Sequence, residues 1–62
     1  MLSSKVEAAL NAQIGLEGYA SFIYLAMASW CDAQSLDGCT KYMRRQSDEE
    51  RMHMLKIFDY IS

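Results

Sequence analysis

Three side chains that can bind a metal ion, Glu17, Glu50 and His53, lie where the sequence pattern calls for apolar residues. At alternating steps of four and three, each half of the chain gives a largely apolar stripe, typical of a helix that packs against a neighbour. The stripes run Val6, Leu10, Gln13, Glu17, Ala20, Tyr24, Met27 and Cys31, then Leu36, Cys39, Met43, Gln46, Glu50, His53, Ile57 and Tyr60. A carboxylate is rare in a core unless it is paired or bound to a metal. Carboxylate oxygens and an imidazole suit iron, manganese or zinc.

The elements that must position these side chains are two helices. The chain has 62 residues, 52% of them hydrophobic, with no proline and only three glycines. Ser4-Lys5-Val6-Glu7 has the pattern of a capping box, and Ser35 is placed to cap a second helix. We therefore expect one all-α domain over residues 1–62, with a helix over about 4–32, a short turn, and a helix over about 36–61. A link that short makes the helices antiparallel.

The hairpin brings the three polar side chains to one height. A turn centred near residues 34 and 35 places Glu17 level with residues 52 and 53, while Glu50 and His53 lie one turn apart on one face. Three ligands do not complete a site. Two hairpins paired about a two-fold axis would supply four carboxylates and two imidazoles, the donor set of di-iron helical bundles. The alternative is that Glu17 pairs with a basic group, His53 is an ordinary core histidine and Glu50 faces solvent.

Composition excludes several classes of partner. The net charge of −2 and the scattered basic residues argue against nucleic-acid binding. The first residues lack the features of a signal peptide, so a cytoplasmic protein is expected. The most apolar stretch, residues 19–31, is shorter than the ~20 residues that span a bilayer, so we expect no membrane segment. Two helices bury little, so we also expect an oligomer or a fragment of a longer protein.

Two segments carry a resemblance to a known family. The stretch LEGYASFIYLAMASW covers residues 16–30, and RRQSDEERMH covers residues 44–53. With them, the whole chain is similar to the first two helices, and the turn between them, of a bacterial-type non-haem ferritin subunit. The resemblance implies half of a ferritin-like four-helix bundle, and a di-iron ferroxidase centre used in iron storage. In that centre Glu17 is a terminal carboxylate, Glu50 bridges two iron ions, and His53 is the nitrogen ligand.

The resemblance also bears on residues beside the metal ligands. Tyr24 matches the family's nearby tyrosine, a hydrogen-bond donor and electron source, although core packing explains it equally well. Haem-binding relatives carry a methionine directly after the ligand glutamate, and Arg51 stands at that position here, so no haem is expected. The remaining ferritin ligands lie on later helices, which this sequence lacks. A second chain is expected to complete the site, with dioxygen or peroxide as the oxidant.

Other functions remain open from the sequence. The chain fits equally a structural or assembly hairpin, or a ferritin fragment without a working metal site, and a metal-binding module without redox activity is a third interpretation. Cys31 and Cys39 face each other near the turn, so a disulfide between them is conceivable. We favour free thiols, because helices pack about 8–10 Å apart and a disulfide needs Cα atoms within about 7 Å. A second apolar stripe on the first helix indicates another neighbour or a subunit interface: Leu16, Tyr19, Ile23, Ala26 and Trp30.

Overall fold

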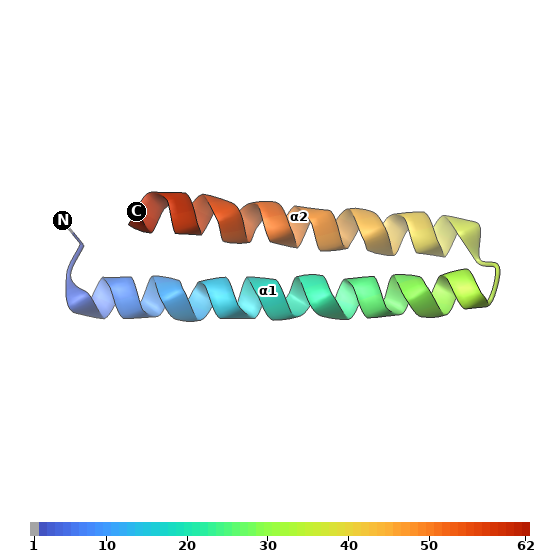
Figure 1. Ribbon diagram of the computed structural model, residues 1–62, viewed down its shortest axis with the longest axis horizontal. Coiled ribbons are helices and arrows are strands. Elements are labelled where there is room, and N and C mark those ends of the chain that lie inside the picture. The colour runs from blue at the N-terminus through green and yellow to red at the C-terminus, as the bar shows by residue number, and fades with distance from the viewer. Residues whose placement is uncertain (1) are drawn as a thin grey trace.

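The chain forms an antiparallel pair of helices, as the sequence predicts. The computed structural model describes residues 2–62, with α1 at Ser4–Ala33 and α2 at Asp37–Ile61. The two helices lie side by side along their length, with both chain ends at one end of the hairpin and the turn at the other (Figure 1). The hairpin measures 48 × 14 × 10 Å. The all-α hairpin is thus confirmed, and each helix begins within about one residue of its expected start.

The N-terminus of α1 is capped by Ser3. Its hydroxyl accepts a hydrogen bond from the Val6 backbone N–H at 3.2 Å, and its carbonyl accepts one from the Glu7 N–H at 2.9 Å. The predicted capping box, which placed Ser4 at the cap, is therefore wrong by one residue. Both serines have the right chemistry, and sequence alone does not separate them. Glu7 remains in the first turn, where its negative charge favours the helix dipole.

The turn ends α1 with a Schellman motif. The Leu36 N–H donates to the Cys31 carbonyl at 2.9 Å, and the Ser35 N–H donates to the Asp32 carbonyl at 3.0 Å. Ser35 has a φ of 59°, the left-handed conformation that this motif requires. The expected capping of the second helix by Ser35 is therefore wrong. Leu36 occupies the N-cap of α2 and makes no side-chain capping hydrogen bond.

Replacing Ser35 with glycine is expected to stabilise the hairpin by about 1 kcal/mol. A left-handed residue other than glycine costs about 1–2 kcal/mol, and the greater freedom of glycine in the unfolded chain offsets part of the gain. Chemical denaturation measures the difference. As a control, Ser29→Gly places the same substitution inside α1, where it should lower stability by about 0.5 kcal/mol. Equal destabilisation by both substitutions would contradict the assigned turn.

Cys31 and Cys39 form a disulfide that links the helices beside the turn. Their Cα atoms lie 5.9 Å apart, so the expectation of free thiols is wrong. Ordinary helix spacing does not apply here, because a three-residue link holds the ends of α1 and α2 close together. Small side chains allow this approach. Ala28 and Cys31 are the most buried hydrophobic residues, each 3% exposed.

Removing this disulfide is expected to destabilise the hairpin by about 2.5 kcal/mol. The cysteines are eight residues apart in sequence, and closing a loop of that length removes a corresponding amount of chain entropy from the unfolded state. Denaturation with and without a thiol reductant measures the effect, and Cys31→Ala/Cys39→Ala should unfold identically under both conditions. An unchanged midpoint for the reduced wild-type chain would show that the bond does not stabilise the hairpin.

The seam between the helices follows the predicted heptads only in part. On α1 it contains Leu10, Ile14, Glu17, Ser21, Tyr24, Ala28 and Cys31, and on α2 Met43, Ser47, Glu50, Met54, Ile57 and Ile61. Several predicted seam members lie exposed instead: Val6, Gln13, Met27, Leu36, His53 and Tyr60. The apolar surface of α1 is wider than one neighbouring helix can cover, so periodicity does not fix which edge of it faces α2.

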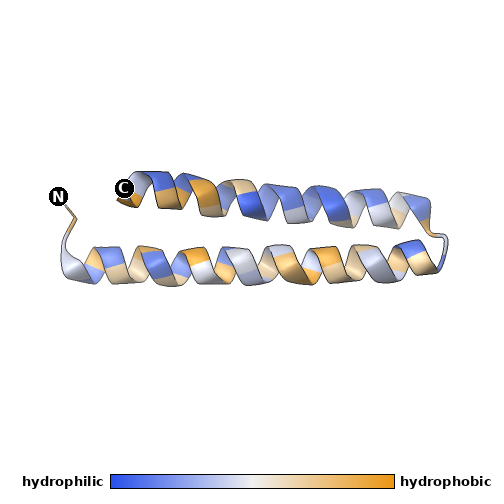
Figure 2. Cartoon of the chain, viewed as in Figure 1, coloured by the Kyte–Doolittle hydropathy of each residue, from blue (hydrophilic) through white to orange (hydrophobic). Residues whose placement is uncertain are grey.

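Much apolar surface remains uncovered. Hydrophobic residues recur along all of α1, whereas the middle of α2 is mainly hydrophilic (Figure 2). The second apolar stripe of α1 is open to solvent, with Leu16 64%, Tyr19 67% and Trp30 61% exposed. No helix in the described part of the chain is long and apolar enough to cross a membrane. A helix that is apolar on several faces is suited to contact more than one neighbour.

Candidate metal centre

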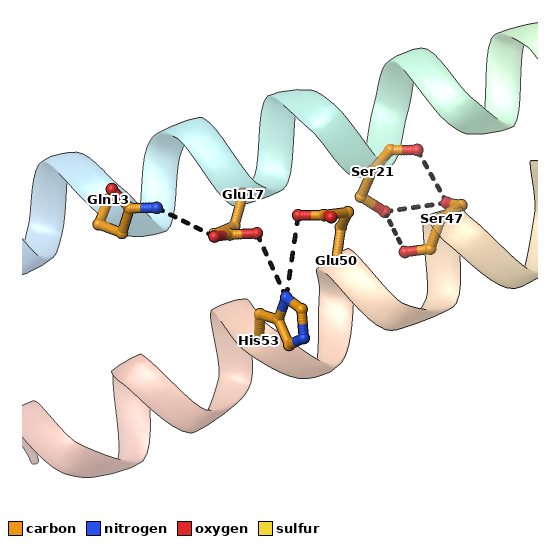
Figure 3. A network of polar contacts seen from close by, with 6 residues as sticks. All are labelled: Gln13, Glu17, Ser21, Ser47, Glu50 and His53. Carbon is orange, nitrogen blue, oxygen red and sulfur yellow. Dashed lines mark hydrogen bonds and ion pairs between the residues drawn. The ribbon is translucent and has the colours of Figure 1, made fainter.

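Glu17, Glu50 and His53 converge midway along the hairpin, as the turn geometry predicts. Glu17 extends from α1, and Glu50 and His53 extend from successive turns of α2 (Figure 3). Nδ1 of His53 lies 3.7 Å from Oε2 of Glu17 and 4.0 Å from Oε2 of Glu50. One donor atom from each residue lies within 4.8 Å of the others. A cation placed among them would therefore meet two oxygen donors and one nitrogen donor.

The cluster combines a sheltered side and an open side. The side chains of Glu17 and Glu50 are 17% and 24% exposed, whereas that of His53 is 56% exposed. Both carboxylates lie on the seam, and the imidazole lies at its edge. This asymmetry leaves one face of the cluster accessible to an ion from solvent or to ligands from another chain.

The two carboxyl groups have opposite pKa shifts. Hydrogen bonding with Glu50, and then with Gln13, lowers the pKa of Glu17. The Gln13 contact runs from Nε2 to Oε1 of Glu17 at 3.0 Å. The same carboxyl contact, with partial burial and repulsion from the Glu17 charge, raises the pKa of Glu50. Of the two carboxyl groups, Glu50 therefore binds a proton more readily than Glu17.

One oxygen of the cluster lacks a partner. Oε2 of Glu17 is buried and has no hydrogen-bond partner among residues 2–62, and no lysine or arginine in that range forms an ion pair with Glu17. The alternative in which Glu17 pairs with a basic group is therefore not supported for lysine or arginine in the described residues, whereas Nδ1 of His53 lies within ion-pair distance of this oxygen, at 3.7 Å. A buried acceptor of this kind is satisfied by a proton shared with Glu50 or by a cation. Hard oxygen donors with an imidazole fit iron, manganese or zinc.

Tyr24 lies outside the cluster. It is half-buried on the same seam of α1, one heptad from Glu17 toward the turn. No hydrogen bond joins it to Glu17, Glu50 or His53 in the structure of residues 2–62. Its proposed part in iron oxidation remains a prediction, and packing in the seam accounts for its position.

Three residues beside the cluster were not identified from the sequence as part of it. Gln13 was placed on a seam but not recognised as the hydrogen-bond partner of Glu17, four residues away. Ser21 and Ser47 form hydrogen bonds across the seam within one turn of the carboxylates. Counting residues from the hairpin turn, which placed Glu17 level with His53, also brings these two serines to nearly the same height. A serine in a helix carries no distinctive signal, however, so they were not singled out.

Comparison with known proteins decides the family. Residues 7–62 match the family model described as the ferritin-like domain. The chain belongs to the ferritin-like family. Over 62 residues it is 47% identical to the bacterial non-heme ferritin of Staphylococcus epidermidis and 44% identical to a probable bacterial non-heme ferritin-like protein of Haemophilus influenzae. It is 37% identical to the bacterial non-heme ferritin of Escherichia coli O157:H7.

These matches cover all of this ferritin-like chain but only part of each relative. The chain spans 37% to 38% of the length of these three proteins. No solved structure shows a significant match. The family membership confirms the resemblance seen in the sequence, and the cluster of Glu17, Glu50 and His53 supplies the local chemistry on which a function can be proposed.

Proposed function

We propose that this ferritin-like chain binds ferrous iron and contributes to its oxidation during iron storage. In this proposal Glu17 is a terminal ligand, Glu50 bridges two iron ions and His53 is the nitrogen ligand. The observation that carries the proposal is the convergence of these three residues at one place, where Oε2 of Glu17 is buried without a hydrogen-bond partner. The relatives named as bacterial non-heme ferritins support iron as the ion.

The reaction places definite demands on these side chains. Each ferrous ion loses one electron, and two electrons with two protons reduce dioxygen to hydrogen peroxide, or peroxide to water. Carboxylates suit this change because they bind an iron ion through one or two oxygens and balance its rising charge. Glu50, with one side chain shared between two ions, would keep them close enough to react as a pair. Tyr24 is proposed as a nearby hydrogen-bond donor, and as an electron source only where the oxidant takes more than the two electrons that the iron pair supplies; no haem is involved.

A second chain would complete the site. Three donors leave a pair of iron ions short of ligands, and the open face beside His53 offers room for more. One face of α1 also exposes apolar side chains, among them Leu16, Ile23 and Met27. A second copy packed against them would bury this surface and bring its own two carboxylates and imidazole to the ions. The assembly is proposed as a homodimer or a larger homo-oligomer, in the cytoplasm.

Anaerobic titration with ferrous iron, followed by oxygen, tests the proposal. The expected result is two iron ions per pair of chains, with a transient oxidised species when oxygen is added. Binding without oxidation would favour a metal-binding module instead. No binding would leave a structural hairpin, or a ferritin fragment without a working site, as the better account.

A further inference from the structure

A reciprocal pair of serines joins the two helices next to the metal ligands. The Ser21 hydroxyl donates to the Ser47 carbonyl at 2.9 Å, and the Ser47 hydroxyl donates to the Ser21 carbonyl at 2.8 Å. The two hydroxyl oxygens also lie 2.9 Å apart. We call this arrangement the serine clasp. It links a side chain of each helix to the backbone of the other, so it restrains both the spacing and the axial register of α1 and α2.

The serine clasp lies one helical turn from the carboxylates, on the side that is nearer to the link between α1 and α2. Ser21 follows Glu17 by four residues on α1, and Ser47 precedes Glu50 by three residues on α2 (Figure 3). Ser47 is only 6% exposed, so little water competes for these hydrogen bonds. A helical turn is rigid over this distance, and the clasp therefore restrains the positions from which Glu17 and Glu50 extend.

A second close approach lies at the height of the ligands themselves. A Cβ atom on Gly18 would lie 3.2 Å from Sδ of Met54, closer than ordinary packing allows. The missing side chain of Gly18 thus lets Met54 pack against α1 beside Glu17 and His53. Contacts at this height and one turn away therefore hold the helices together beside the two carboxyl groups.

We propose that Ser21 and Ser47 are positioning residues that set the separation of the Glu17 and Glu50 carboxylates, and thereby the affinity and coordination geometry of the iron site. The inference rests on the proposed function and deepens it. Without the clasp, the spacing and register of α1 and α2 are less restrained at this height, and the two carboxylates adopt a wider range of separations before a metal binds. Part of the binding free energy is then spent on drawing the ligands together again.

The test compares Ser21→Ala/Ser47→Ala with the wild-type chain and with the control Ser29→Ala. Ser29 is an exposed serine two turns along α1 from Ser21, so it controls for the loss of a hydroxyl from this helix. Cobalt(II) is titrated anaerobically as a redox-stable probe, and its visible absorption spectrum reports coordination geometry. Ferrous iron is titrated in parallel, and chemical denaturation of the metal-free proteins measures their stability.

We expect the double variant to bind both metals about tenfold more weakly, the size of effect typical of residues that orient metal ligands. Its cobalt spectrum should differ from that of the wild-type chain. Metal-free stability should change little, because the two backbone carbonyls that lose a hydroxyl donor still accept hydrogen bonds from N–H groups within their own helices. Single variants should show intermediate affinities, since each keeps one hydroxyl that donates to a backbone carbonyl.

Two outcomes would overturn the inference. An unchanged affinity and cobalt spectrum in the double variant would show that the clasp does not position the ligands, while the wild-type binding would leave the proposed function intact. A loss of affinity matched by an equal loss of metal-free stability, with the wild-type spectrum retained, would assign the serines a purely structural part. Failure of the wild-type chain to bind either metal would instead refute the proposed function, and the inference with it.

Discussion

Replacing Glu50 with alanine is expected to abolish iron oxidation and to weaken iron binding by at least about 100-fold. Loss of residues that merely support a ligand costs about 10- to 100-fold in affinity, and Glu50 is proposed to bind both ions directly. The substitution also removes the carboxyl group whose contact lowers the pKa of Glu17. Ferrous iron titration measures the affinity, and the rate of ferric product formation after oxygen is added measures the reaction.

Glu49→Ala is the matched control for this prediction. It removes the same charge from the neighbouring position of α2, but Glu49 is exposed and lies off the seam. Iron binding and oxidation should therefore remain close to wild type. A Glu50→Ala variant that oxidises iron at the wild-type rate would show that the proposed metal centre is wrongly assigned.

Acidification is expected to stabilise the metal-free hairpin at first while weakening its affinity for iron. The pKa of Glu50 is raised, so the folded state holds its proton more tightly than the unfolded state. Stability therefore increases as pH falls through the raised pKa toward 4.5, the ordinary value. The pKa of Glu17 is lowered, so the stability it contributes is lost as pH falls further, through its folded pKa. Circular dichroism during denaturation at a series of pH values measures this profile.

The affinity for metal is expected to fall over the pH range in which acidification first stabilises the metal-free hairpin. Below the raised pKa of Glu50, a metal ion must displace the proton of this carboxyl group, and this competition costs about tenfold in apparent affinity per pH unit. His53 must also be neutral to bind the ion. Glu50→Gln serves as the control, because it removes the titrating group and should abolish the initial gain in stability. The prediction fails if the stability profiles of the wild-type chain and the Glu50→Gln variant coincide between neutral pH and the ordinary glutamate pKa of 4.5.

Much of the fold could be predicted because it depends on local signals. Two stretches with apolar residues at helical spacing, joined by a link too short to let the second helix continue in the same direction, leave an antiparallel hairpin as the simple solution. The capping residue of α1 and the role of Ser35 were predicted wrongly, because only small free-energy differences decide which of several neighbouring serines caps a helix and which residue ends one. The disulfide was missed because average helix spacing does not describe helices beside a tight turn.

The candidate site was predictable where it depended on height along the hairpin, and less so where it depended on rotation of the helices. Counting residues from the hairpin turn predicted that Glu17 lies level with His53, and in the structure Oε2 of Glu17 is 3.7 Å from Nδ1 of His53. The rotation of each helix about its axis was not determined, so Ser21 and Ser47 were not expected in the seam. That rotation is set by which small side chains allow close approach, a property of both helices together.

The central claim is that Glu17, Glu50 and His53 form half of an iron site that a second chain completes. Native mass spectrometry of the chain, with and without ferrous iron under anaerobic conditions, tests it most directly because it counts chains and ions in the same species. The account predicts that iron increases the population of a dimer that carries two iron ions, and that Glu50→Ala prevents this increase. A single chain that retains iron, or a dimer that forms equally well without iron and binds none, would contradict it.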